Sequence, residues 1–189
     1  MFLPIQNKPK IVTDFKKLVI EIPDLISEDL AEELRMFALN KDFSGHHRRG
    51  SKSKDCVASF YTCLMFQHDH RVYDILDSAW KQFCAINNPL IDFVEPYEIK
   101  SYIEGDVFSP HSDILINSEL GLERKMNLIV QLSPETEYDG GDLMVGPNRC
   151  SRKQGTGIFF PSHYIHSVTE ITRGNRYSLV GHAWGPRFK

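Results

Sequence analysis

Two side chains that commonly bind metal ions stand two positions apart in the stretch "SPHSDIL", residues 109–115. The neighbouring residues predict a β-strand, in which alternate side chains project from the same face. His111 and Asp113 would then lie about 6 to 7 Å apart along the chain, so that an imidazole nitrogen and a carboxylate oxygen could converge on one ion. We expect a third ligand from another strand, and His166 suits this position better than His163, which follows a Pro-Ser turn.

Two histidines and one carboxylate would occupy one face of an octahedral metal ion. Three adjacent positions then stay open, which suits a non-haem iron(II) ion that accepts a bidentate co-substrate and oxygen. Zinc can bind the same residues together with a water molecule, and the matching activity would be hydrolysis. The triad alone therefore leaves iron and zinc as alternatives.

Arg176 bears on the choice between these metals. It lies ten residues after His166, just past the turn "TRGN", at the start of the predicted last strand. A guanidinium held inside a roll, whose sheets lie about 10 Å apart, could bind the far end of a metal-bound dicarboxylate. A hydrolytic zinc site has no evident use for such an arginine, so the pattern favours iron with an organic acid. The alternative is an ion pair of Arg176 with Glu170. Further residues on the same face of the last strand would be Ser178, Val180 and His182.

The N-terminal half predicts two helices and two strands. Ser27 has the character of an N-cap, and acidic residues follow it where the helix dipole favours them, so the first helix is expected over 28–40. Apolar residues at helical spacing predict a second helix over 70–86. Alternating and β-branched stretches predict strands within 15–26 and 56–66.

The stretch between the first helix and the second strand is polar and punctuated by glycine and serine, which predicts a loop. Its basic part, residues 44–54, has two interpretations. It is either a solvated charge run or a lid that recruits an acidic or phosphate-bearing substrate.

From residue 93 onward, short apolar stretches alternate with glycine-containing turns, and they predict short strands that include 93–103, 108–115 and 166–172. Such spacing predicts an antiparallel sandwich or roll. The expected fold class is α+β, mainly β, with two helices packed outside a β roll. We expect one domain over 1–189, with a supporting region over 1–92 and the catalytic core over 93–189.

Composition excludes several classes of function. Lys and Arg number 22 against 25 Asp and Glu, so the net charge of -3 offers no overall basic field for nucleic acid. The chain has no apolar run near the roughly 20 residues that span a bilayer, and its start lacks a secretory pattern. Four cysteines without a CxxC pair fit a reducing compartment. We therefore expect a soluble, cytoplasmic protein without a membrane segment or an obligate protein partner.

Three stretches carry a resemblance to a known family: "YIEGDVFSPHSD", "MNLIVQLSPETEYDGGDLMV" and "GTGIFFPSHYIHSVTEITRGNRYSLVGHAW". Over residues 95–184 the chain resembles the iron(II)/2-oxoglutarate-dependent dioxygenases, and within them the prolyl 4-hydroxylase-like branch that includes the PKHD-type hydroxylases. The resemblance implies a double-stranded β-helix, or jelly roll, buttressed by N-terminal helices. It also implies that His111, Asp113 and His166 bind Fe(2+).

The resemblance implies roles for further residues. Arg176 would bind the distal carboxylate of 2-oxoglutarate with help from Ser178, and Tyr102 would reach its metal-end carboxylate. Gln131 stands where prolyl hydroxylases often carry a tyrosine beside the 2-oxoglutarate pocket. His182 stands where several carry a substrate-lining tryptophan, which makes it a candidate substrate contact. The "YDGGDL" turn would serve the shape of the roll.

The implied activity is hydroxylation of an unactivated C–H bond coupled to decarboxylation of 2-oxoglutarate, with ascorbate as a candidate reductant. A prolyl residue in a peptide or protein is the first expected substrate, and a free amino acid or another small metabolite is the alternative. A nucleobase ranks third. A different class of function is a non-catalytic jelly-roll binding module whose metal serves stability. The sequence leaves the substrate itself undetermined.

Overall fold

The computed structural model describes residues 19–40, 56–57, 60–64, 69–87 and 90–187. The basic segment 44–54, for which a lid was one interpretation, lies outside these residues. In the part of the chain that is described, neither helix combines the length and apolar character that a membrane crossing requires.

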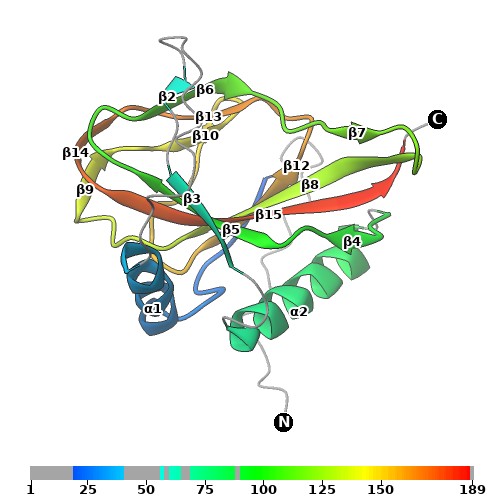
Figure 1. Ribbon diagram of the computed structural model, residues 1–189, viewed down its shortest axis with the longest axis horizontal. Helices are drawn as coiled ribbons and strands as arrows, with labels where there is room; N and C mark the ends of the chain where they lie inside the picture. The colour runs from blue at the N-terminus through cyan, green and yellow to red at the C-terminus, as the bar shows by residue number, and fades with distance from the viewer. Residues whose placement is uncertain (1–18, 41–55, 58–59, 65–68, 88–89, 188–189) are drawn as a thin grey trace.

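Two antiparallel sheets face each other and form the body of the molecule (Figure 1). The larger sheet has the order β1-β12-β8-β15-β5-β3, with β4 paired to β15 and β7 paired to β8. Its strands are β1 (Ile20–Ile22), β3 (Phe60–Leu64), β4 (Phe93–Val94), β5 (Tyr97–Tyr102), β7 (Ile116–Asn117), β8 (Leu122–Gln131), β12 (Gly157–Pro161) and β15 (Arg176–Pro186).

The smaller sheet has the order β11-β10-β13-β6-β2. Its strands are β2 (Cys56–Val57), β6 (Val107–His111), β10 (Leu143–Val145), β11 (Asn148–Arg149) and β13 (His166–Val168). A separate two-stranded ribbon joins β9 (Tyr138–Gly140) to β14 (Ile171–Gly174).

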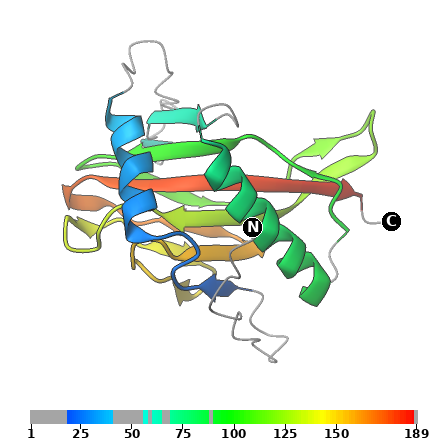
Figure 2. The same cartoon turned by 90° about the horizontal axis from the view of Figure 1, so that it is seen from below.

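Both predicted helices are present and lie across the outer face of the larger sheet (Figure 2). Helix α1 (Glu28–Leu39) begins as predicted, because Ser27 Oγ accepts a hydrogen bond from the Leu30 amide at 3.1 Å. Helix α2 (His70–Asn87) buries Trp80 and Phe83, which pack their rings against Phe159 of β12. These contacts form one hydrophobic core between the helices and the sheet.

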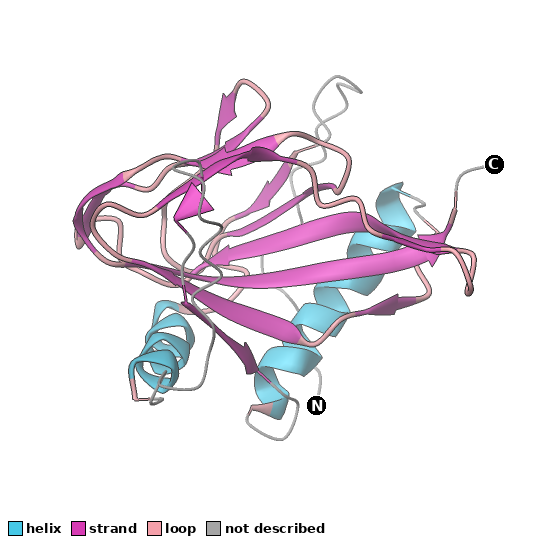
Figure 3. Cartoon of the chain, turned by 45° about the horizontal axis from the view of Figure 1, so that its top comes forward, coloured by secondary structure: helices cyan, strands magenta, loops and turns pink. Residues whose placement is uncertain are grey.

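The strands of the two sheets are magenta in Figure 3, and a second hydrophobic core fills the space between these sheets. The larger sheet contributes Ile129 and Val180, and the smaller sheet contributes Val145 and Val168. Side chains of β8 and β15 therefore alternate between the helix-facing core and this inner core, as the geometry of a buried strand requires. The architecture confirms the predicted β roll with two helices outside it.

Three predicted strands are shorter or more divided than the sequence pattern suggested. The stretch 93–103 is interrupted at Glu95 and Pro96 and yields β4 and β5. The stretch 166–172 divides between β13 in the smaller sheet and β14 in the ribbon, because the Ile171 amide donates to the Asp106 carbonyl oxygen at 2.9 Å. The stretch 108–115 ends its strand at His111, which matters for the site.

Candidate active site

The structure brings the three predicted metal ligands together between the two sheets. His111 ends β6, His166 begins β13, and the two are partners in the ladder between these strands. Asp113 Oδ1 lies 3.5 Å from His111 Nε2, and Asp113 Oδ2 lies 3.2 Å from His166 Nε2. Neighbouring ligands of an octahedral ion, each about 2.1 Å from it, lie about 3 Å apart. The three side chains therefore fit one ion after small shifts.

Asp113 reaches this position from outside the strand, so the prediction that it shares a strand with His111 is wrong. Its amide donates to the Ser162 carbonyl oxygen at 2.9 Å, which ties the chain to the turn that precedes β13. The chain thereby leaves the β6 ladder after His111. The carboxylate turns back toward both imidazoles, and the ligand atoms of the triad all lie within 4.8 Å of one another.

Both imidazoles are oriented by backbone carbonyl groups. His111 Nδ1 lies 2.8 Å from the Ser109 oxygen, and His166 Nδ1 lies 3.1 Å from the Tyr164 oxygen. Because a carbonyl only accepts hydrogen bonds, each Nδ1 carries the proton and each Nε2 directs its lone pair toward the site. Among the described residues, His111 Nε2 is buried and has no hydrogen-bond partner, and a divalent metal would bind its lone pair.

The sequence interpretation missed Asn127, a fully buried residue of β8 that orients the carboxylate. Its amide nitrogen donates to Asp113 Oδ2 at 2.8 Å. Its amide oxygen accepts hydrogen bonds from Ser162 Oγ and His182 Nδ1, both at 3.0 Å. No motif marks Asn127, because its partners lie 14, 35 and 55 residues away.

The electrostatics of the site favour a charged carboxylate and a neutral His182. Burial alone would raise the pKa of Asp113, but the imidazoles of His111 and His166 beside the carboxylate hold that pKa well below its usual range. Burial, together with the Arg124 guanidinium, lowers the pKa of His182 to about 3. Asp113 is therefore anionic near neutral pH, and His182 is an uncharged donor to Asn127.

A narrow cavity of about 20 Å³ lies between the sheets from the triad to Arg176, and Tyr102, Ser178 and Val180 line it as well. Arg176 is 1% exposed and lies at the first position of β15, as predicted. Its guanidinium carbon lies 5.3 Å from the centre of the Tyr102 ring. This places a fixed cation and a tyrosine in the same cavity as the metal ligands, the arrangement that a dicarboxylate co-substrate requires.

Gln131 and Ser178 lie near Arg176. Gln131 ends β8, and Ser178 is on β15, the strand that begins with Arg176. Gln131 Oε1 accepts a hydrogen bond from Arg176 Nη2 at 2.9 Å, so Gln131 holds the guanidinium in place. Ser178 faces Gln131 in the ladder between β15 and β8. Arg176 Nε is buried without a hydrogen-bond partner, which leaves a donor for a ligand. No ion pair of Arg176 with Glu170 occurs in the described structure at 4.0 Å or less.

The glycine pair of the "YDGGDL" turn shapes the wall behind Arg176. Gly141 has a φ of 64°, and a Cβ atom there would lie 2.3 Å from Ile171 Cδ1 and 3.2 Å from Arg176 Cδ. At Gly140 a Cβ atom would lie 1.9 Å from the Glu170 carbonyl oxygen. The turn therefore needs glycine for conformation and for close packing against the arginine stem.

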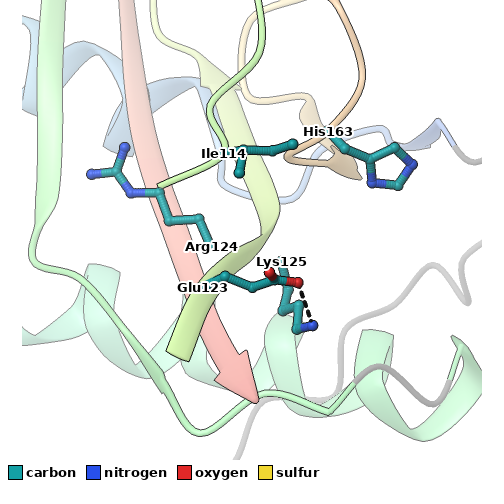
Figure 4. A pocket seen from close by; sticks show the side chains of 5 residues that line it. All are labelled: Ile114, Glu123, Arg124, Lys125 and His163. Carbon is teal, nitrogen blue, oxygen red and sulfur yellow. Dashed lines mark hydrogen bonds and ion pairs between the residues drawn. The ribbon is translucent and has the colours of Figure 1, made fainter. Parts of the chain in front are cut away.

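A second pocket has a volume of about 330 Å³, and Figure 4 shows the five side chains that line it. Ile114, which directly follows Asp113, forms part of its wall, and so does His163, which stands in the turn rather than among the metal ligands. Lys125 Nζ lies 2.7 Å from Glu123 Oε1, and Arg124 Nη2 lies 2.7 Å from Glu95 Oε2. The cations of this pocket are thus paired with carboxylates.

A family model and individual relatives match this chain in sequence. The model of the 2OG-Fe(II) oxygenase superfamily matches residues 97–184. A PKHD-type hydroxylase of Idiomarina loihiensis is 31% identical over 88 residues, which span 44% of this chain and 39% of that relative. A PKHD-type hydroxylase of Hyphomonas neptunium is 30% identical over 173 residues, which span 86% of this chain and 76% of that relative. The match thus covers less than half of the first relative.

The fold of this chain is also found among solved structures. The chain is similar to the viral collagen prolyl hydroxylase of Paramecium Bursaria Chlorella virus-1, solved as a 2OG complex, with a TM-score of 0.69 and 19% identity. The alignment covers 90% of this chain and 97% of the viral chain. At this identity the similarity shows a shared fold, which confirms the predicted double-stranded β-helix.

Proposed function

The chain belongs to the 2OG-Fe(II) oxygenase superfamily, and on this premise we propose that it is an iron(II)- and 2-oxoglutarate-dependent dioxygenase that hydroxylates a C–H bond. The observation that carries the proposal is a single cavity bounded by the ligands His111, Asp113 and His166 and by the buried cation Arg176. We further propose a prolyl residue in a peptide or protein as the substrate. The names of the PKHD-type relatives and of the viral prolyl hydroxylase support a hydroxylase and a prolyl target, respectively.

The protein's own residues would act by positioning and by electrostatics. His111, Asp113 and His166 would hold Fe(2+), which supplies the oxygen chemistry when it is bound with 2-oxoglutarate and oxygen. The backbone carbonyls of Ser109 and Tyr164 keep both imidazoles in the tautomer that can bind metal. These hydrogen bonds fix the orientation of both imidazoles, as a metal site requires.

At the other end of the cavity, Arg176 would bind the distal carboxylate of 2-oxoglutarate. Its guanidinium is already held by Gln131, and its unpartnered Nε is available to a carboxylate oxygen. Ser178 and Tyr102 line the same space, and Tyr102 would approach the other carboxylate. The apolar wall residues Ile129 and Val180 would exclude water between the two ends.

An anaerobic titration tests the co-substrate site directly. Protein loaded with iron(II) should develop a weak visible charge-transfer band when 2-oxoglutarate is added, and admission of oxygen should yield succinate. A search for products heavier by one oxygen atom among proline-containing peptides then tests the substrate. Folded protein without the band and without oxygen-dependent succinate would exclude the proposal, and activity with zinc in the absence of oxygen would indicate a hydrolase instead.

A further inference from the structure

Lys100 is a second cation in the cavity between the triad and Arg176 (the main cavity). The function proposed above gives this residue no role. It belongs to β5 and lines the same cavity as His111, His166 and Arg176. Its Nζ lies 5.7 Å from the centre of the Phe108 ring, whose centre lies 4.0 Å from that of the His111 ring. Phe108 is thus near both the ammonium group and His111, and Lys100 lines the cavity that holds the candidate metal ligands.

No carboxylate neutralises this ammonium group within the part of the chain that the structure describes. Lys100 takes part in no ion pair at 4.0 Å or less, not even with Glu98, which shares its face of β5. The neighbouring pocket differs, because Arg124 and Lys125 each lie 2.7 Å from a glutamate oxygen. A partly buried lysine without an anionic partner is costly unless a ligand supplies the missing anion.

The charges of the cavity would cancel without Lys100 once iron and 2-oxoglutarate are bound. Ferrous iron and Arg176 would bring three positive charges, while Asp113 and the two carboxylates of 2-oxoglutarate would bring three negative charges. These cancel before Lys100 is counted. Both carboxylates of 2-oxoglutarate already have a site, one at the metal and one at Arg176. Lys100 is therefore the uncompensated charge of the loaded cavity.

We infer that Lys100 selects a substrate that carries a carboxylate close to the carbon to be hydroxylated. This inference rests on the proposed function and narrows its substrate class. The carboxylate has two possible sources, an acidic side chain next to the target residue or the free α-carboxylate of a C-terminal residue or amino acid. Both would place an anion opposite Lys100 while the target C–H bond faces the metal.

Matched pairs of proline peptides distinguish these sources. One pair places Asp or Asn beside the proline, and the other carries a free or an amidated C-terminus after it. Binding to the manganese-loaded protein with 2-oxoglutarate is measured without oxygen by calorimetry, and hydroxylation is measured with iron by mass spectrometry. The acidic member of at least one pair should bind about 10- to 100-fold more tightly than its neutral counterpart, as expected for a charged hydrogen bond.

Variants of Lys100 test whether this residue causes the preference. Lys100→Met should remove it, Lys100→Arg should retain most of it, and Lys81→Met at an exposed position of α2 should leave it unchanged. Affinity for 2-oxoglutarate should stay within about twofold in all three variants. Equal binding within both pairs would overturn the inference, and so would a preference that persists in Lys100→Met.

One further outcome would reassign the residue. A loss of 2-oxoglutarate affinity of about tenfold or more in Lys100→Met would make Lys100 a co-substrate ligand, against the inference. Failure of the proposed function has a separate signature, since wild-type protein would then form no succinate from 2-oxoglutarate under oxygen. The two failures are therefore distinguishable in the same preparations.

Discussion

The two ends of the main cavity hold their polar groups in different ways. At the metal end, both histidines have their outer nitrogens bound to backbone carbonyls, and the carboxylate is bound by Asn127. At the opposite end, Arg176 donates to Gln131, but its buried Nε has no partner within the described structure. Each end thus keeps one buried unpartnered atom for a ligand, but backbone carbonyls and Asn127 orient the metal end, whereas one side chain, Gln131, holds the arginine end.

This difference separates two kinds of binding that a single cavity has to combine. A metal ion needs a few atoms held within a few tenths of an ångström, which hydrogen bonds to backbone groups can provide. A dicarboxylate is longer and needs a fixed charge at the correct distance, which one buried guanidinium provides. Substitutions at the two ends should therefore have separable effects on metal affinity and on co-substrate affinity.

The largest effect is expected from Asp113→Ala, which removes the anionic ligand of the metal end. Metal affinity should fall by at least about 100-fold, more than is typical when only an outer partner of a ligand is lost. Turnover of 2-oxoglutarate should fall with it. Manganese binding by calorimetry and succinate formation measure the two effects, and circular dichroism checks the fold. Metal affinity within about threefold of wild type would contradict the assignment of the triad.

Arg176→Met addresses the other end of the cavity. Affinity for 2-oxoglutarate should fall by about 10- to 100-fold, because a charge-assisted pair is lost, while metal affinity should stay within about threefold. Titration of 2-oxoglutarate into the manganese-loaded protein measures the first quantity. Arg173→Met serves as the control, since Arg173 is an exposed arginine of β14 that pairs with Asp139. An equal loss of metal affinity would mean that the two ends are not separable.

The smallest effect is expected from Asn127→Ala, which leaves the triad intact and removes the group that orients it. Metal affinity should fall by about tenfold, at the lower end of the range for outer partners of ligands. Co-substrate affinity, measured at saturating metal, should change little. Asn148→Ala on β11 is the matched control, because Asn148 is exposed in the smaller sheet. An unchanged metal affinity would show that Asp113 is held without Asn127.

Local features of the structure could be predicted from the sequence alone. Ser27 and the acidic residues after it predicted the start of α1, and apolar spacing predicted α2, because a helix is held by contacts within a few residues. The grouping of His111, Asp113 and His166 was also predicted from residue types and their order, since metals accept few kinds of side chain. Arg176 was expected at the start of the last strand because it follows the turn "TRGN", and it is the first residue of β15.

Other features depended on the tertiary structure, because contacts between distant residues decide them. The Asp113 amide bonds to Ser162 and ends the β6 ladder, which turns the carboxylate toward the imidazoles. Asn127 meets its partners only when β8 lies beside β15 and the turn before β13. Lys100 enters the cavity because β5 pairs with β15.

Residue chemistry thus determined which side chains are candidate metal ligands, and short-range periodicity determined the two helices. Sheet order and long-range hydrogen bonds decided which further polar groups surround those ligands. The physical reason is that a helix turn or a metal preference is a local property. A strand's neighbours, in contrast, are selected by burial and pairing across the whole chain.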